Sequence, residues 1–266
     1  MRAAFLLAGL ALAATASAQE LVSLPTRDGV TQSFFLASMD GRKPEAAALM
    51  FIGGGGDINL RMEGGRPRFN AGNFLPRARA EFIRNGILPV IMDNPTDQKG
   101  PGQMSDGFRG GAEHVVDVRA VIAEVKRRFP GVPVFLVGTS RSTISIAYLA
   151  RAIGADEVKG GVLSSSLFTL TNKLRVQPVL ESFDWSTARI PLLFVHHRED
   201  ACFATPYTAA AVLADRFPLV SVRGGKPPES GPCDPLAAHG FFGREAATVD
   251  AIAAWMLGKP FAKDIE

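Results

Sequence analysis

The chain has 266 residues, of which 47% are hydrophobic, so it is long enough to bury one sizeable core. Its formal net charge is only +3 and its basic residues are scattered along the sequence, which argues against a nucleic-acid-binding surface. We therefore expect no nucleic-acid partner and a single domain over residues 19–266.

The N-terminal residues have the pattern of a secretory signal peptide. Arg2 precedes an apolar run over residues 3–14, and Ala16-Ser17-Ala18 places small residues where a signal peptidase cleaves. The apolar run is too short to span a bilayer. We expect cleavage after Ala18 and a periplasmic or secreted mature protein without stable membrane insertion.

The chain contains two cysteines, Cys202 and Cys233. In an oxidising compartment a lone pair of cysteines forms a disulfide more often than it stays as two free thiols. We therefore expect these two to be bonded, with a catalytic thiol as the alternative.

The mature chain begins with a predicted hairpin and a buried strand. Residues 21–24 and 32–36 carry apolar runs around a turn, which predicts an antiparallel hairpin. Residues 46–52 form a continuous apolar run, typical of a strand covered on both faces. This strand leads into Gly53-Gly54-Gly55-Gly56, where missing side chains allow a close backbone approach. The run matches neither a phosphate-binding loop nor a dinucleotide fingerprint. A merely flexible loop is the alternative.

Two long loops separate the next predicted elements. Residues 57–74 are polar and rich in arginine, and residues 93–111 contain several glycines and prolines, so both segments are expected to be surface loops. His114 and Asp117 are expected to be capping and charge features of a helix and not ligands. The expected elements here are helices over residues 76–85 and 112–128 and a strand over residues 87–92.

A predicted strand-to-helix turn follows. Residues 132–138 form an apolar, β-branched run, and residues 141–153 are compatible with a helix. Ser140 lies on the sharp turn between them, with small residues two positions away on either side, Gly138 and Ser142. An ordinary turn with a helix-capping serine is the alternative.

The remaining segments continue the alternation of strands and helices. Ser164, Ser165 and Ser166 end one strand, where they line a cleft or simply fit a crowded strand end. His196 and His197 are expected to be structural, because a two-histidine metal site would need a carboxylate at a better defined spacing. Thr205 is expected to cap a helix that begins at Pro206. The expected elements are strands over residues 160–163, 190–195 and 217–222 and a closing helix over residues 244–257.

These features together resemble the α/β-hydrolase family, of the secreted bacterial serine-esterase type. Gly138-Thr139-Ser140-Arg141-Ser142 is similar to its G-x-S-x-G nucleophile elbow, with Ser142 in place of the second glycine. The resemblance implies an α/β fold with a mostly parallel central sheet, helices on both faces and an N-terminal antiparallel hairpin. The triad it implies stands in the family's chain order: Ser140, Asp200 and His239.

The resemblance also implies a role for each group. Ser140 would be the nucleophile, His239 the general base, and Asp200 the acid that orients the imidazole, with Glu199 as a competing acid. The oxyanion hole would use the backbone N–H of Arg141 and one from the glycine run, where Ile52 replaces the family's frequent histidine. The expected donor in that run is Gly54 or Gly55.

The implied function is hydrolysis of carboxylic esters of small soluble substrates through an acyl-enzyme, with no cofactor or metal. A bond between Cys202 and Cys233 would join the loops that carry Asp200 and His239. Residues 171–189, where the family often inserts a lid, are few, so we expect an open site; Arg141 and the loop arginines would favour anionic substrates. A peptidase or acyltransferase with the same triad, or a non-catalytic envelope binding protein, are the alternatives.

Overall fold

The computed structural model describes residues 19–100, 103–169 and 180–266. The predicted signal peptide, residues 1–18, lies outside the described residues, and so do residues 171–179 of the segment where a short lid is expected. No helix in the described ranges is long and apolar enough to cross a membrane.

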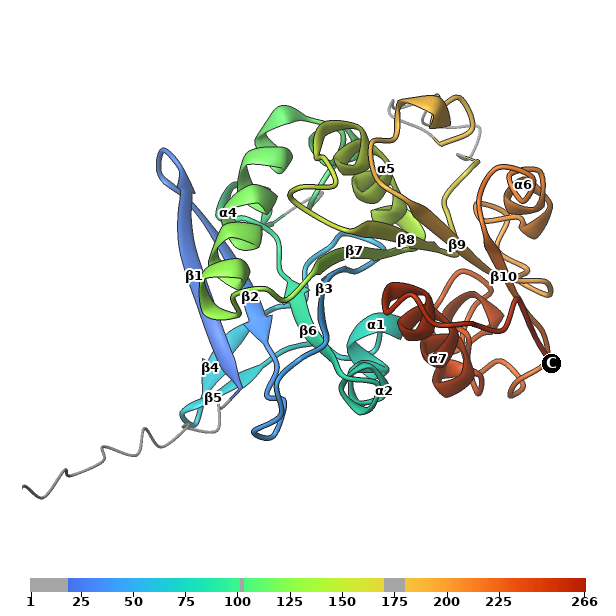
Figure 1. The fold of residues 1–266 in the computed structure, drawn as a ribbon, viewed down its shortest axis with the longest axis horizontal. Coiled ribbons are helices and arrows are strands. Elements are labelled where there is room, and N and C mark those ends of the chain that lie inside the picture. The colour runs from blue at the N-terminus through green and yellow to red at the C-terminus, as the bar shows by residue number, and fades with distance from the viewer. Residues whose placement is uncertain (1–18, 101–102, 170–179) are drawn as a thin grey trace, which may run out of the picture.

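A nine-stranded sheet organises the fold, in the order β1-β2-β6-β3-β7-β8-β9-β10-β11 (Figure 1). β1 pairs antiparallel with β2, and β2 with β6, whereas the other neighbours are parallel. The predicted mostly parallel sheet and N-terminal hairpin are therefore confirmed. The strands are β1 Glu20–Arg27, β2 Val30–Leu36, β3 Ala46–Phe51, β6 Ile87–Met92, β7 Val134–Thr139, β8 Gly160–Ser164, β9 Leu192–His197, β10 Leu219–Val222 and β11 Asp264–Ile265.

Helices cover both faces of this sheet. Figure 1 shows α4 and α5 over one face and α1, α2 and α7 over the other. Every residue of β3, β6, β7, β8 and β9 is buried as a result, which explains why their sequences are continuous apolar runs. The helices are α1 Phe74–Arg77, α2 Arg79–Arg84, α3 Asp106–Arg109, α4 Ala112–Arg128, α5 Thr143–Ala152, α6 Tyr207–Ala211 and α7 Glu245–Met256, with 3₁₀ turns at η1 Thr96–Gln98, η2 Ser140–Ser142, η3 Trp185–Thr187 and η4 Ala238–Gly240.

The strand order brings two of the predicted site segments together. β3 lies between β6 and β7, so the chain passes from β3 to a neighbour on one side and returns to β3's other side at β7. Phe51, the last residue of β3, is in register with Gly138 of β7. The glycine run and the Ser140 turn therefore leave the sheet side by side, at the type of crevice where such sheets bind ligands.

The first expected loop, residues 57–74, contains a small hairpin that the sequence analysis missed. β4 (Arg61–Glu63) pairs antiparallel with β5 (Arg66–Arg68). Gly64 and Gly65 join them with φ values of +58° and +72°, the left-handed conformation that a tight two-residue hairpin turn requires. The prediction of a plain loop here is wrong, and the glycine pair was the signal.

Three other element predictions need correction. The helix expected over residues 76–85 is two short helices, α1 and α2, because the backbone leaves helical geometry at Ala78. The loop expected over residues 93–111 contains η1 and α3, the latter capped by Ser105 Oγ, which accepts from the Phe108 N–H. The strand expected over residues 217–222 is not the last, because β11 adds in parallel to β10 and buries Ile265.

Candidate active site

Ser140 lies on a strained turn between β7 and α5. Its φ of +56° falls in the left-handed region, which a side chain other than glycine rarely adopts. A Cβ atom at Gly138 would lie 2.5 Å from Ile146 Cγ1, so the residue two positions earlier must be glycine for α5 to pack against the sheet. A Cβ atom at Gly53 would lie 2.8 Å from Ser140 Cβ, so the glycine run also needs a bare backbone next to the serine.

Ser142, which occupies the second glycine position of the elbow pattern, stabilises this turn. Its Oγ accepts from the Thr139 N–H at 2.9 Å and donates to the Phe51 carbonyl at 2.5 Å. Because Phe51 ends β3 and Thr139 ends β7, one buried hydroxyl joins the ends of both strands. The serine in place of glycine therefore adds hydrogen bonds between the two strand ends and leaves the turn intact.

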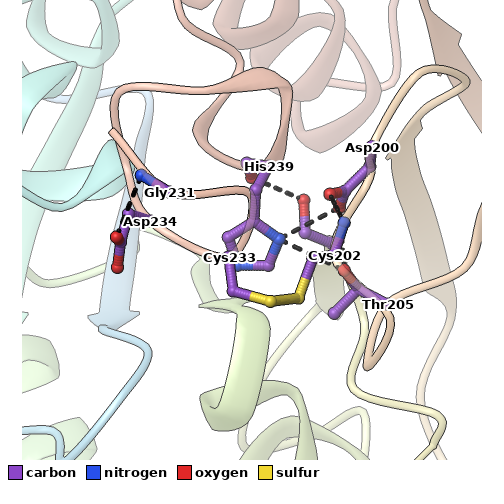
Figure 2. Close-up of a disulfide and its surroundings, with 8 residues drawn as sticks. Asp200, Cys202, Thr205, Gly231, Cys233, Asp234 and His239 are labelled. Atoms are coloured by element: carbon purple, nitrogen blue, oxygen red, sulfur yellow. Dashed lines mark hydrogen bonds and ion pairs between the residues drawn. A yellow bond between two sulfur atoms is a disulfide. The ribbon is translucent and has the colours of Figure 1, made fainter. Parts of the chain in front are cut away.

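Asp200 and His239 meet at the ends of two other loops (Figure 2). His239 Nδ1 lies 3.0 Å from Asp200 Oδ2, and both side chains are buried, with 6% and 0% exposed. The Cys202 N–H donates to Asp200 Oδ1 at 2.9 Å. Glu199 points elsewhere and accepts from the Gly224 N–H. Of the two candidate acids, the structure brings Asp200 to the histidine.

Thr205 contacts both Asp200 and His239 and does not have the helix-capping role expected from the sequence. It does not cap α6, since Pro206 occupies the position before that helix. Its Oγ1 donates to Asp200 Oδ2 at 2.8 Å and lies 3.2 Å from His239 Nδ1, as Figure 2 shows. The threonine hydroxyl therefore fixes the carboxylate from the side opposite the Cys202 N–H.

The predicted disulfide is present between Cys202 and Cys233 (Figure 2). Cys202 is two residues after Asp200, and Cys233 is in the proline-rich segment that leads to His239. The bond therefore joins the loop after β9 to the loop before η4, the two loops that carry the acid and the histidine.

Ser140 and His239 line the same cavity, which has a volume of about 170 Å³. Gly54 lines it as well, whereas Gly55 does not, and the Cα of Gly55 faces the Gln103 side chain. Several lining residues, among them Asn73, Phe74 and Asp234, were not predicted, because they come from segments whose path the sequence does not reveal. The described residues that line the cavity are Gly53, Gly54, Asn73, Phe74, Thr139, Ser140, Cys233, Asp234, Pro235, His239 and Gly240.

The charge of this cavity differs from the sequence-based expectation. The Arg141 guanidinium is paired with Asp106 at 2.6 Å and does not line the cavity. Apart from the histidine, Asp234 is the one ionisable side chain among the described lining residues, and it is acidic. The expected preference for anionic substrates therefore finds no support in the cavity.

The serines at the end of β8 and directly after it have structural contacts behind the site. Ser165 Oγ donates to the His239 carbonyl at 2.8 Å, and Ser164 Oγ donates to the Gly138 carbonyl at 3.1 Å. The Ser166 N–H donates to His196 Nε2 at 2.9 Å. These contacts hold the backbone on both sides of the site, and none of the three serines is among the residues described as lining the cavity.

The two histidines that end β9 also make internal contacts. His196 is fully buried, and this desolvation lowers its pKa to about 3, so its ring is neutral at physiological pH. His197 Nε2 lies 2.9 Å from the Gly224 carbonyl. Within the described ranges, no group of three or more histidine, cysteine, aspartate or glutamate side chains could hold a metal ion.

His114 and Asp117 are interior residues and not exposed features of the start of α4. Asp117 accepts from Thr26 and from Arg27, so it joins α4 to β1. His114 packs between the rings of Phe51 and Phe108, and its burial lowers its pKa to about 3. The expected capping role is wrong, because Gly111 occupies the cap position.

Comparison with known proteins relates this geometry to hydrolases. Residues 79–225, more than half of the chain, match the family described as serine aminopeptidase, S33. No curated protein matches the chain.

Solved structures share the fold. Est1E from Butyrivibrio proteoclasticus is 13% identical with a TM-score of 0.59, over 90% of this chain and 98% of Est1E. The esterase domain of a Rhodothermus marinus protein is 16% identical with a TM-score of 0.57, over 91% of this chain and 99% of that domain. A puromycin-hydrolyzing peptidase from Mycobacterium tuberculosis is 14% identical with a TM-score of 0.57, over 96% of this chain and 42% of the peptidase.

Proposed function

Because the chain belongs to the serine aminopeptidase S33 family of α/β hydrolases, we propose that it is a serine hydrolase that cleaves carboxylic esters of small soluble substrates. The observation that carries this proposal is the shared cavity: Ser140 and His239 both line it, and Asp200 is hydrogen-bonded to the far nitrogen of the same histidine. Strain at Ser140 and burial of Asp200 are typical of groups arranged for chemistry.

The reaction would proceed through an acyl-enzyme. His239 takes the proton of the Ser140 hydroxyl while the serine oxygen attacks the ester carbonyl carbon. The negative charge that develops on the carbonyl oxygen is stabilised by the backbone N–H groups of Arg141 and Gly54. The tetrahedral intermediate collapses, the C–O bond to the alcohol breaks, and the alkoxide receives the proton from His239. Water then attacks the acyl-enzyme by the same route and releases the acid and Ser140.

Asp200 supports this cycle without exchanging a proton. Its carboxylate holds the proton of His239 on Nδ1, which leaves Nε2 free to act as the base, and it stabilises the imidazolium formed in each half-reaction. Thr205 and the Cys202 N–H keep the carboxylate in place. Gly54 is the preferred second oxyanion donor, since it lines the cavity and Gly55 does not.

An aminopeptidase is the second candidate. The observation that favours it is Asp234, whose exposed carboxylate lines the cavity and would attract the ammonium group of a free amino terminus. The same triad serves amide hydrolysis, and it serves acyl transfer when an alcohol or amine replaces water.

We also propose that the protein acts in the periplasm or outside the cell, without a cofactor or metal. The disulfide between Cys202 and Cys233 supports an oxidising compartment, in agreement with the signal-peptide pattern of residues 1–18.

The test is labelling of the purified protein with a fluorophosphonate probe, followed by peptide mapping. We expect one adduct, on Ser140, that is lost in Ser140→Ala and in His239→Ala. Rates on matched p-nitrophenyl esters and aminoacyl p-nitroanilides then separate esterase from aminopeptidase. Folded wild-type protein that takes no label would contradict the proposal and favour a non-catalytic binding protein.

A further inference from the structure

A buried arginine lies directly beneath the glycine run. Arg109, at the end of α3, is only 1% exposed, and its Nη2 donates to the Gly54 carbonyl at 3.0 Å. Burying a guanidinium is unfavourable unless its surroundings compensate for lost hydration. The placement of this cation against a site loop therefore calls for an explanation.

The glycine run turns its carbonyl groups toward the protein. The Gly53 carbonyl accepts from the Gly56 N–H at 3.2 Å, and the Gly54 carbonyl accepts from Arg109. The Gly55 carbonyl accepts from Asn94 Nδ2 at 2.9 Å and from a backbone N–H at 3.1 Å. Because a trans peptide is planar, the N–H that shares a peptide unit with each carbonyl, which belongs to the following residue, points the opposite way; for the Gly53 carbonyl this is the Gly54 N–H.

Gly56 lies directly against the side chains of Asn94 and Arg109. A Cβ atom there would be 2.4 Å from Asn94 Oδ1 and 3.1 Å from Arg109 Nη2. Its φ of +83° likewise favours glycine. The fourth glycine is therefore required by the contact with Arg109 and Asn94, whereas Gly53 is required by the contact with Ser140.

The other end of α3 contacts the side chain of Arg141, the residue whose backbone N–H is the other proposed oxyanion donor. Asp106, 4% exposed, accepts from Arg141 Nε at 2.6 Å and from Arg141 Nη2 at 3.1 Å. Arg141 follows Ser140 directly in the chain. A single helical turn thus contacts the nucleophile turn through Asp106 and the glycine run through Arg109.

The charges in this cluster are arranged around one carboxylate. Burial and the nearby charge of Arg141 lower the pKa of Arg109 to about 10, while Asp106 opposes this shift. Arg109 is therefore still charged at neutral pH. Its hydrogen bond to the Gly54 carbonyl is charge-assisted and buried, so it restrains the backbone of Gly54, whose N–H lies in the preceding peptide unit.

We propose that Asp106 and Arg109 are positioning residues that hold the two oxyanion donors, the N–H groups of Arg141 and Gly54, in place. The inference rests on the proposed function, since it assigns a role within the same site. The glycine run is then preorganised by a buried cation, and no rearrangement is needed when the oxyanion forms.

Arg109→Met and Arg109→Lys test this proposal. We expect Arg109→Met to lower kcat on a p-nitrophenyl ester about 10- to 100-fold with KM changed less than about threefold, because loss of a single oxyanion donor lowers kcat by about 100-fold or more. Affinity for a boronic acid that mimics the tetrahedral intermediate should fall in parallel. Arg109→Lys should recover part of both losses.

Arg27→Met is the matched control. Arg27 pairs with buried Asp117 at 2.9 Å, so its loss removes another cation with a buried polar partner, and neither Arg27 nor Asp117 lines the cavity. This variant should lose stability and keep its kcat.

The outcomes separate the two proposals. If the wild type neither turns over esters nor takes the fluorophosphonate label, the proposed function fails and this inference with it. If the wild type is active and Arg109→Met keeps its kcat within about threefold, the positioning role alone is overturned. Should Arg109→Met fail to fold, Arg109→Gln and Asp106→Asn are judged by the same kcat criterion.

Discussion

The two halves of the candidate site are held by different means. The nucleophile half, Ser140 with the glycine run, leaves the ends of adjacent strands β3 and β7 and is fixed by hydrogen bonds from Ser142 and Arg109. The acid–histidine half, Asp200 with His239, lies on two loops that a disulfide joins.

The difference follows from the position of His239. Ser140, Gly54 and Asp200 each lie within three residues of a strand end, whereas His239 follows the end of β10 by 17 residues. Strand ends are placed by the ladder of the sheet, so a few buried hydrogen bonds suffice to orient the residues that follow directly. A loop such as the one over residues 223–237 has more conformational freedom to lose, and a covalent link reduces that freedom in the unfolded chain.

The largest expected effect is loss of the acid. We expect Asp200→Asn to lower kcat about 10³- to 10⁴-fold, since the amide no longer holds the correct imidazole tautomer or stabilises the imidazolium. Glu199→Gln is the control, because Glu199 bonds to the Gly224 N–H and not to His239, and it should stay within about threefold of wild type. Steady-state kinetics on one ester measures both variants, and the reverse ranking would make Glu199 the acid.

Loss of the disulfide is the next largest expected effect, and it should loosen only the acid–histidine half. We expect the Cys202→Ser, Cys233→Ser double variant to lose about 2–4 kcal/mol of the free energy of unfolding, measured by urea denaturation. Amide hydrogen exchange should speed up in residues 198–206 and 223–241 and stay unchanged in residues 51–56 and 138–143. Equal loss of protection in both halves would mean that they are not held separately.

The nucleophile half was the easier one to predict from sequence, for the same physical reason. Buried parallel strands need continuous apolar runs, so β6 and α4 have the predicted bounds and the strand before Ser140 differs by only two residues at its start and one at its end. Gly138 and the glycine run are visible in sequence because a close approach admits no other residue.

The supporting contacts were not predictable, because they join residues that are far apart in the chain. Arg109 reaches Gly54 across 55 positions, and nothing in the local sequence of α3 indicates that contact. Thr205 reads as a helix cap before Pro206, and only the path of the loop turns its hydroxyl toward Asp200. Backbone geometry is encoded locally, whereas these side-chain contacts depend on the assembled fold.

The smallest expected effect is a loss of stability in acid that comes from two buried histidines, one behind each half of the site. His114 lies behind the nucleophile half with a pKa lowered to about 3, and His196 lies behind the acid–histidine half with the same shift, both through burial. Their ordinary pKa is near 6.5. Between pH 6.5 and 3 the unfolded chain binds protons that the folded chain cannot, so the free energy of unfolding falls as the pH falls.

His114→Phe isolates one half, since the His114 ring packs between Phe51 and Phe108 and its nitrogens have no hydrogen-bond partner among the described residues. His196 is less suitable because it accepts from the Ser166 N–H. We expect urea denaturation to give similar stability for wild type and variant at pH 7. Between pH 7 and pH 4 the free energy of unfolding should fall less in the variant than in the wild type. The reason is that each buried neutral histidine contributes up to about 1.4 kcal/mol per pH unit to this fall. If the free energy of unfolding has the same pH profile in wild type and variant, His114 does not contribute to the loss of stability in acid.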